Sequence, residues 1–347
     1  MSHEVFITIV NVSSISLTQE RFREYLSGVW DTEAKNRILR YHKGCASAAD
    51  FHPHLHDDTK CFLIGRLLLQ LNALANITRS GPSSQWYGDL ADLPEVGPFA
   101  VDELQQCKQA FMKTDEGKPH FENKFGWTAN VSHAGSLVGC SSTRHLLNGL
   151  DIMPIELVPV PRHISVSDSS RLFWRSVLIR DDLQEFFGYF DSYFTENEWA
   201  WIRAGMVEQD DFESLRRFFR NWTLKESYIK AIGIGLGLEL CRAEFRIPDA
   251  ITSCDVESTG NAVFDLTLSD VQFYLDGILQ PQWKFVCFDL PHANAVAALA
   301  LGPLDEAVSP LFPHLDTKSH QLTLHHHIML RFSSEEKIIS IALDIQH

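Results

Sequence analysis

Residues 214–232, SLRRFFRNWTLKESYIKAI, constrain the fold of this chain more than any other segment. Apolar side chains recur there at helical spacing, which predicts a helix with much of its surface buried. Glycines at 233, 235 and 237 follow at once and predict the end of that helix and a turn. Residues 60–74, KCFLIGRLLLQLNAL, show similar spacing and predict a second buried helix.

Strand patterns lie on both sides of these helices. The apolar run near the N-terminus predicts a first strand, and WTANVSHAGSLVGCS at 127–141 predicts two strands around a turn at Ala134 and Gly135. The segment HLLNGLDIMPI predicts a strand that ends at Pro154. Further strand patterns follow the glycines: CRAEFRI, AVFDLTL, QFYLDG, QWKFVCFDL and AVAALALG. The expected fold class is therefore α+β, a mixture of helices and strands.

Two segments between these patterns are expected to differ in character. FFGYFDSYF at 186–194 predicts a helix, and Thr195 with Glu198 three residues later predicts a capping box that starts the next helix. Residues 159–182 carry proline, serine and mixed charges, which indicates a surface insertion.

The helices and strands divide into two halves, each with one central helix. We place the boundary within 141–148 and assign residues 1–145 to an N-terminal half and residues 146–302 to a C-terminal half. Residues 303–347 form a C-terminal extension whose role the sequence does not indicate.

The charge and the cysteines exclude several classes of protein. The formal charge is −15, from 45 acidic and 30 basic side chains, which argues against general nucleic-acid binding. No apolar stretch approaches the roughly 18 residues that a membrane span needs, so no membrane association is expected. Seven scattered cysteines without a CxxC pair favour reduced thiols, and the N-terminus does not resemble a signal peptide. We therefore expect a cytosolic protein.

Two other patterns suggest binding sites that their context disfavours. The series GIGLG resembles a dinucleotide-binding loop, but it closes a helix instead of opening one, so a nicotinamide-dependent oxidoreductase is disfavoured. His325, His326 and His327 are consecutive in a strand-like stretch, so all three side chains cannot face one metal ion.

One group of polar residues is harder to explain as ordinary surface. Glu226 and Lys230 are four residues apart and share a helix face, which by itself is typical of an exposed ion pair. That helix is largely apolar, however, and Asp151 lies in the apolar strand GLDIM. A buried carboxylate needs a cation, a metal or hydrogen bonds, so a metal site shared by Asp151 and Glu226 competes with the ion-pair interpretation.

Three motifs together resemble a known family. NVSHAGSLVGC at 130–140, GLDIM at 149–153 and NWTLKESYIKAIGIGLGLEL at 221–240 resemble the signatures of the 4′-phosphopantetheinyl transferases, closest to the animal members of the Sfp-like group. KCFLIGRLLLQ, KTDEGKPHF and WKFVCFDL with AVAALAL follow the same family order, so the resemblance covers roughly residues 5–302.

The resemblance implies a fold and an activity. Members of this family have two similar halves related by pseudo-twofold symmetry, with coenzyme A between them. They transfer the 4′-phosphopantetheine arm of coenzyme A to a serine of an apo acyl or peptidyl carrier protein and release adenosine 3′,5′-bisphosphate. The resemblance also implies a monomer that uses Mg²⁺. The alternative is a non-catalytic paralogue that binds coenzyme A or carrier proteins.

The resemblance also assigns metal and catalytic roles within the C-terminal half. Asp151 and Glu226 match the Mg²⁺ ligands, and carboxylate oxygens suit that ion. Bacterial members often have an acidic residue two positions after the aspartate. This chain has Met153 there, and the animal enzyme also has a methionine at that position. Lys230 matches the lysine that stabilises charge on the leaving pyrophosphate. Either Glu226 or a metal-bound water removes the proton of the acceptor serine.

The remaining matches place coenzyme A mostly against the N-terminal half. Arg66 matches a position that contacts the nucleotide phosphate, and Lys113 and Lys118 match basic positions near coenzyme A. Ser132 and His133 match a serine–histidine pair in which the histidine reaches the 3′-phosphate. The resemblance completes the coenzyme A site with Asp151, which acts through the metal, and Lys230, which contacts the pyrophosphate.

Overall fold

The structure is a computed structural model, and it describes the greater part of the chain. The described residues are 3–13, 17–43, 57–77, 101–122, 126–157, 171–248, 262–265, 271–290, 293–308 and 326–332. Side chains are described over most of these ranges, but not in strands β8 and β13.

The described residues form eight α-helices and thirteen strands, besides short 3₁₀ turns. The helices are α1 (Gln19–Gly28), α2 (Thr32–Lys43), α3 (Asp57–Ile77), α4 (Val101–Ala110), α5 (Arg171–Val177), α6 (Arg180–Gly188), α7 (Glu196–Val207) and α8 (Asp211–Ile232). The strands are β1 (His3–Asn11), β2 (Phe111–Lys113), β3 (Pro119–Phe121), β4 (Trp127–Ala134), β5 (Leu137–Arg144), β6 (Leu147–Pro154), β7 (Ala243–Arg246), β8 (Ala262–Asp265), β9 (Gln272–Leu275), β10 (Ile278–Leu279), β11 (Lys284–Leu290), β12 (Ala295–Gly302) and β13 (His326–Phe332).

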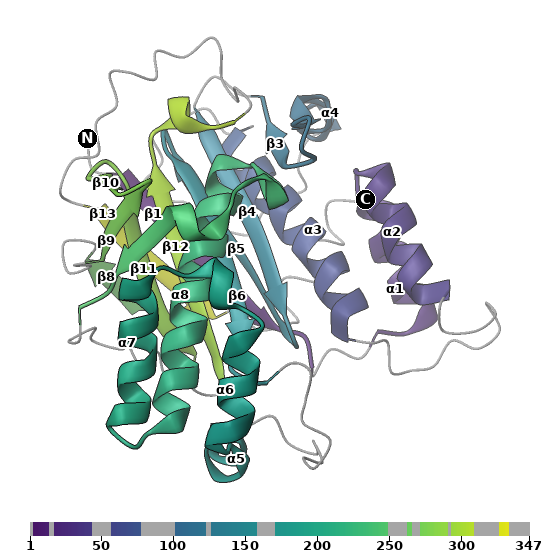
Figure 1. Cartoon of the computed structure of the whole chain (residues 1–347). Coiled ribbons are helices and arrows are strands. Elements are labelled where there is room, and N and C mark those ends of the chain that lie inside the picture. The colour runs from purple at the N-terminus through teal and green to yellow at the C-terminus, as the bar shows by residue number, and fades with distance from the viewer. Residues whose placement is uncertain are drawn as a thin grey trace.

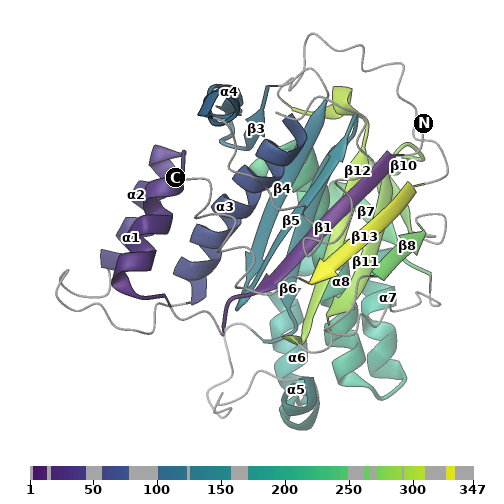
Figure 2. The same cartoon turned by 180° about the vertical axis from the view of Figure 1, so that it is seen from behind.

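Two sheets lie between two groups of helices. One sheet has the order β4-β5-β1-β13-β8, and the other has the order β11-β12-β6. Helices α5–α8 cover the three-stranded sheet in Figure 1, whereas the five-stranded sheet faces the viewer in Figure 2 and has α1–α3 beside it. Smaller sheets, β10-β9-β7 and β2-β3, lie at the margins. The predicted mixture of helices and strands is confirmed, whereas two symmetry-related halves stay a prediction.

The alternation of side chains along the strands explains this layering. In β1, Ile7 and Ile9 pack with the three-stranded sheet, whereas Val10 packs with the helices on the other side. In β12, Leu299 faces the five-stranded sheet, and the neighbouring Ala298 faces α8 and its surroundings. The small alanines of β12 leave room for the helix to approach that sheet closely.

Helix α8 has the local signals that fix its ends. Asp210 is its N-cap and accepts a hydrogen bond from the backbone N–H of Glu213 at 3.0 Å. Gly233 ends it in the left-handed conformation, with φ of 83°, which a glycine adopts without steric cost. The predicted helix and its glycine end are confirmed. The helix at 60–74 is likewise confirmed as the interior of α3.

Two expectations in the middle of the chain were wrong. The predicted helix at 186–194 ends at Gly188, and residues 191–193 form a 3₁₀ turn before the capping box at Thr195, which is confirmed. The predicted surface insertion at 159–182 includes α5, whose Trp174 is completely buried among the aromatic side chains of the C-terminal core. Burial of that indole outweighs the charged residues around it. Residues 158–170 lie outside the described part.

The C-terminal extension contributes a strand to the larger sheet. Strand β13 pairs in parallel with β1, from His3 opposite His326 to Ile9 opposite Phe332, and antiparallel with β8. The strand expected around the histidine run is therefore confirmed from His326 onward, and His325 lies outside the described residues. In the part of the chain that the structure describes, no helix is long and apolar enough to cross a membrane.

Candidate active site

The candidate site forms where strand β6 meets helix α8. Leu147, Gly149 and Asp151 alternate along β6 and face the helix. Gly149 lies so close to the helix that an added Cβ would be 2.0 Å from the carbonyl oxygen of Ser227 and 2.4 Å from the backbone nitrogen of Ala231. The missing side chain at Gly149 lets α8 approach, and Asp151 two residues later meets the helix face that carries Glu226 and Lys230.

Asp151 and Lys230 form a direct ion pair. The Nζ atom of Lys230 donates to Oδ1 of Asp151 at 2.5 Å and to Oγ of Ser132 at 2.9 Å. Ser132 in turn donates to the same Oδ1 at 3.2 Å. Asp151 is almost fully buried, whereas the lysine side chain is 29% exposed, so the pair lies at the edge of the interior. The structure therefore brings together Asp151, Lys230 and Ser132.

Lys230 compensates the two carboxylates of the site only in part. The second oxygen of Asp151, Oδ2, is buried and accepts no hydrogen bond within the described residues. Burial, together with the nearby charge of Asp151, raises the pKa of Glu226, and Lys230 only partly offsets this. A hard cation between these groups would satisfy the orphaned oxygen and relieve the repulsion, so the pair fits Mg²⁺. Among the described residues, no group of three or more His, Cys, Asp and Glu is arranged to hold a metal.

His133 lies on the same strand as Ser132 and faces the N-terminal helices. Its ring packs edge-on against Phe62 of α3, with 4.3 Å between ring centroids. Arg37 of α2 lies 4.8 Å from the centroid of that phenyl ring. Burial lowers the pKa of His133, and the positive charges of Lys230, Arg37 and Arg66 lower it further. His133 therefore lies among cations that an anionic ligand would compensate.

Two further predicted residues meet around a buried aspartate. Lys113 lies 3.0 Å from Oδ1 of Asp31 and 2.6 Å from Glu33, and Arg66 lies 4.0 Å from Oδ2 of Asp31. Asp31 also accepts hydrogen bonds from the backbone N–H groups of Glu33 and Ala34, which begins α2. Desolvation opposes its charge, but these bonds and the two cations lower the pKa of Asp31.

Lys118 lies at a different contact. Its Nζ atom donates to the carbonyl oxygen of Ala231 at 2.6 Å, in the last turn of α8. Burial lowers the pKa of Lys118 to about 7. The β2-β3 hairpin thereby reaches the end of the helix that carries Glu226 and Lys230, and Lys118 satisfies one of the carbonyl oxygens left free at the helix C-terminus.

Lys225 next to Glu226 is turned into the interior. It is fully buried and lies 2.8 Å from Glu198, and it also donates to the carbonyl oxygens of Leu240 and Ala243. Glu198 accepts from the backbone N–H of Phe245 at 2.9 Å as well. This pair fixes α8 against α7 and β7. Glu226 and Lys230 lie on another face of α8, the face toward Asp151 of β6.

Asp31 and Arg37 were not predicted from the sequence as residues of the site. Asp31 precedes a run of helix-forming residues, so its capping role has a sequence signal. Its contact with Lys113 joins residues 82 positions apart, and no local pattern predicts that. Arg37 had no signal beyond its charge.

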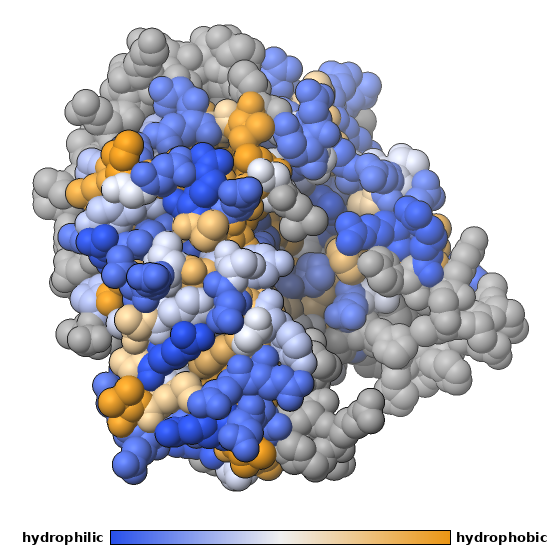
Figure 3. Space-filling model, in the orientation of Figure 1, coloured by the Kyte–Doolittle hydropathy of each residue, from blue (hydrophilic) through white to orange (hydrophobic). Residues whose placement is uncertain are grey.

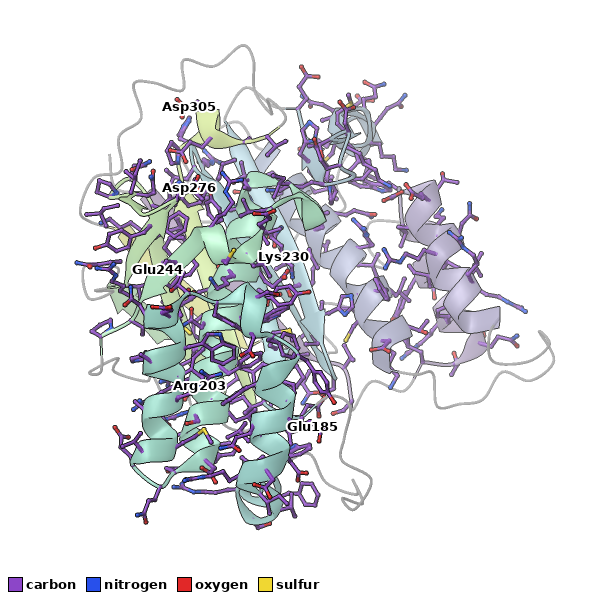
Figure 4. All side chains as sticks on the ribbon, viewed as in Figure 1. Glu185, Arg203, Lys230, Glu244, Asp276 and Asp305 are labelled. Atoms are coloured by element: carbon purple, nitrogen blue, oxygen red, sulfur yellow. The ribbon has the colours of Figure 1, made fainter. Side chains whose placement is uncertain are left out.

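The surface is hollowed beside these residues. Figure 3 shows a depression that separates the body containing the sheets and α8 from the N-terminal helices. Figure 4 places Lys230 on the side of α8 that faces those helices. Asp151 and Lys230 therefore lie on one side of this depression, and the cations around Phe62 belong to helices on the other.

Part of the chain is similar to one superfamily of known proteins. Residues 176–299 match the sequence model of the 4′-phosphopantetheinyl transferase superfamily. This segment contains Glu226 and Lys230, whereas Asp151 and the N-terminal basic residues precede it.

Individual relatives agree with that match. The human L-aminoadipate-semialdehyde dehydrogenase-phosphopantetheinyl transferase is 30% identical over 178 residues, which are 50% of this chain and 47% of that protein. A phosphopantetheinyl transferase of Thraustochytrium sp. is 32% identical over 164 residues, 46% of this chain and 50% of that protein. A 4′-phosphopantetheinyl transferase of Paxillus involutus is 26% identical over 223 residues, 60% and 69% respectively.

The chain spans about half the length of the vertebrate relatives that it matches. Residues 176–299 are therefore similar to the 4′-phosphopantetheinyl transferase superfamily, in agreement with the resemblance expected from the motifs.

Proposed function

We propose that this chain transfers the 4′-phosphopantetheine arm of coenzyme A to a serine hydroxyl of an apo acyl or peptidyl carrier protein. The observation that supports it best is the meeting of Asp151, Glu226 and Lys230 at the contact of β6 with α8, beside the cations around His133. A pyrophosphate needs such positive charge, and an attacking hydroxyl needs a base.

The proposed reaction is a phosphoryl transfer. The serine oxygen forms a bond to the β-phosphorus of coenzyme A, the bond from that phosphorus to the bridging oxygen breaks, and adenosine 3′,5′-bisphosphate leaves. Lys230 stabilises negative charge on the pyrophosphate. Glu226 accepts the proton of the serine hydroxyl, and burial together with the charge of Asp151 raises the pKa of its carboxyl group. His133 and Arg66 bind the nucleotide phosphates.

Asp151 and Glu226 are the residues that would hold Mg²⁺. The ion would supply charge neutralisation of the pyrophosphate oxygens. The thioether of Met153, two residues after Asp151, is too soft a ligand to take part.

The test is transfer of label from coenzyme A to an apo acyl carrier protein in the presence of Mg²⁺. The wild type should label the carrier serine, and Glu226→Gln and Lys230→Ala should each lower the rate by roughly 100-fold or more. Glu185→Gln, an exposed change on α6, is the matched control and should leave the rate unchanged. Absence of label on the carrier with any divalent metal would refute the proposal.

A non-catalytic paralogue that binds coenzyme A or carrier proteins is the alternative. It would bind coenzyme A without transfer. The ion pair of Lys230 with Asp151 and the unsatisfied oxygen of that aspartate favour the catalytic proposal, because binding alone does not require them.

A further inference from the structure

Strands β4 and β6 are joined by side chains of alternate residues on β4. The hydroxyl of Thr128 donates to the carbonyl oxygen of Leu146 and accepts from the side-chain amide of Asn148, each at 2.6 Å. Oδ1 of Asn130 accepts from the backbone N–H of Leu150 at 2.9 Å. These contacts run along β6 toward Asp151.

Ser132 makes the last of these contacts and reaches the site. Its Oγ accepts from the backbone N–H of Ile152 at 3.2 Å and from Lys230 at 2.9 Å, and it donates to Oδ1 of Asp151 at 3.2 Å. A hydroxyl has one proton to donate and two lone pairs to accept. All three are used, and the side chain is buried.

We propose that Ser132 is a positioning residue, which holds Asp151 and Lys230 for the reaction rather than binding coenzyme A itself. The proposal rests on the proposed function only for its kinetic consequences. The hydroxyl fixes Oδ1 of Asp151, so that Oδ2 is the oxygen left without a partner. A contact of Ser132 with a phosphate of coenzyme A would require one of its three hydrogen bonds to break.

Ser132→Ala should therefore separate metal binding from coenzyme A binding. In this variant Asp151 and Lys230 lose a shared partner, so we expect Mn²⁺, measured by electron paramagnetic resonance without coenzyme A, to bind about tenfold more weakly, equivalent to about 1.4 kcal/mol. Coenzyme A affinity, measured by calorimetry in EDTA, should change less than about twofold. The turnover number should fall, with KM for coenzyme A nearly constant.

Two further variants serve as controls. Ser142→Ala makes the same change at a similarly buried residue of β5, whose hydroxyl contacts Asn72 at 3.4 Å, and should leave both affinities unchanged. Ser132→Thr restores a hydroxyl and should recover much of the metal affinity, whereas a loss caused by disturbed packing would not be rescued. If Ser132→Ala does not fold, the nearly isosteric Ser132→Cys replaces it, with the same expected losses because a thiol is a weak hydrogen-bonding group.

Two results would overturn the proposal. One is a Ser132→Ala variant with normal Mn²⁺ affinity and coenzyme A affinity weakened about tenfold, which would assign Ser132 to the ligand. The other is a crystal structure of the variant in which the side chains of Asp151 and Lys230 have not moved. That structure does not depend on transfer activity, so it tests Ser132 even if the wild type labels no carrier protein.

Discussion

The charges of the candidate site are paired with one another before any ligand arrives. Lys230 contacts Asp151, and Lys113 contacts Asp31 and Glu33. An anionic ligand must therefore compete with the carboxylates for these cations. Asp31 bears most on this competition, because it is 6% exposed and lies within 4.0 Å of both Lys113 and Arg66.

Asp31→Asn should strengthen coenzyme A binding. Asparagine keeps an oxygen for the N-terminus of α2, so the helix cap survives, while the negative charge beside Lys113 and Arg66 disappears. We expect affinity to rise about three- to tenfold at low salt and less at 0.5 M salt, measured by calorimetry. Glu33→Gln is the control, because Glu33 is 77% exposed and its charge is largely screened, so affinity should change less than about twofold. Equal gains from both variants would contradict the assignment of the effect to Asp31.

Lys118 should make stability depend on pH. Its pKa is about 7 in the folded protein because the ammonium is buried, and about 10.4 in an unfolded chain. Between these values the unfolded state binds more protons, so the unfolding free energy of the wild type rises with pH. Lys118→Met lacks the amine and therefore this dependence of the unfolding free energy on pH. Relative to the variant, the wild type should gain about 2 kcal/mol of unfolding free energy from pH 7 to pH 9 in urea titrations.

The control for Lys118 is an exposed lysine. Lys108→Met, on α4, should give unfolding free energies that follow the wild type across the same pH range. A constant difference between wild type and Lys118→Met at pH 7 and pH 9 would show that the ammonium of Lys118 is not buried as described.

At the scale of elements, the contact of β6 with α8 decides whether the site exists. The helix lies against Gly149 with no room for a side chain, and Lys225 with Glu198 fixes it from the other side. Glu226 and Lys230 are thus placed relative to Asp151 by backbone packing and not by loops, which gives the geometry that a catalytic group needs.

Gly149→Ala should disrupt this contact. The new methyl group would overlap the backbone of Ser227 and Ala231, which cannot yield without moving the helix. We expect a loss of about 3 kcal/mol in unfolding free energy and weaker binding of Mn²⁺, because Glu226 moves away from Asp151. Gly188→Ala, where nothing lies within 4 Å of the added Cβ, should change stability by less than about 0.5 kcal/mol. Unchanged stability in Gly149→Ala would contradict the packing described here.

At the scale of the whole molecule, local signals were predictable and long-range contacts were not. The end of α8 at Gly233 and the capping box at Thr195 follow from residues close in sequence. The burial of Trp174 does not, because it depends on aromatic residues far along the chain. For the site, the family motifs predicted that Asp151, Glu226 and Lys230 belong together, whereas the ion pair of Asp151 with Lys230 and the pairing of Asp31 with Lys113 emerged only from the tertiary structure.

The C-terminal extension is the clearest case of a long-range contact. Strand β13 lies between β1 and β8, so β1 is an interior strand of the sheet. Within the described residues, β13 is also the strand through which β8 joins this sheet. The apolar residues of β1 that pack between the two sheets belong to the same core as Leu150 and Ile152 of β6. Support for β1 is therefore support for the strand that carries Asp151.

A chain that ends after Val308 should therefore be less stable and more prone to aggregate. Loss of β13 leaves the backbone N–H and C=O groups along one side of β1 unpaired, from His3 to Ile9, and an exposed edge of this kind pairs readily with other chains. We expect the urea midpoint to fall by an amount equivalent to at least about 2 kcal/mol, with some oligomers in light scattering. A chain that ends after Phe332 keeps β13 and is the matched control. It should be as stable as the full-length chain if β13, and not the length of the tail, is responsible for the loss. Equal stability of the two truncated chains would mean that β13 does not support β1 in solution.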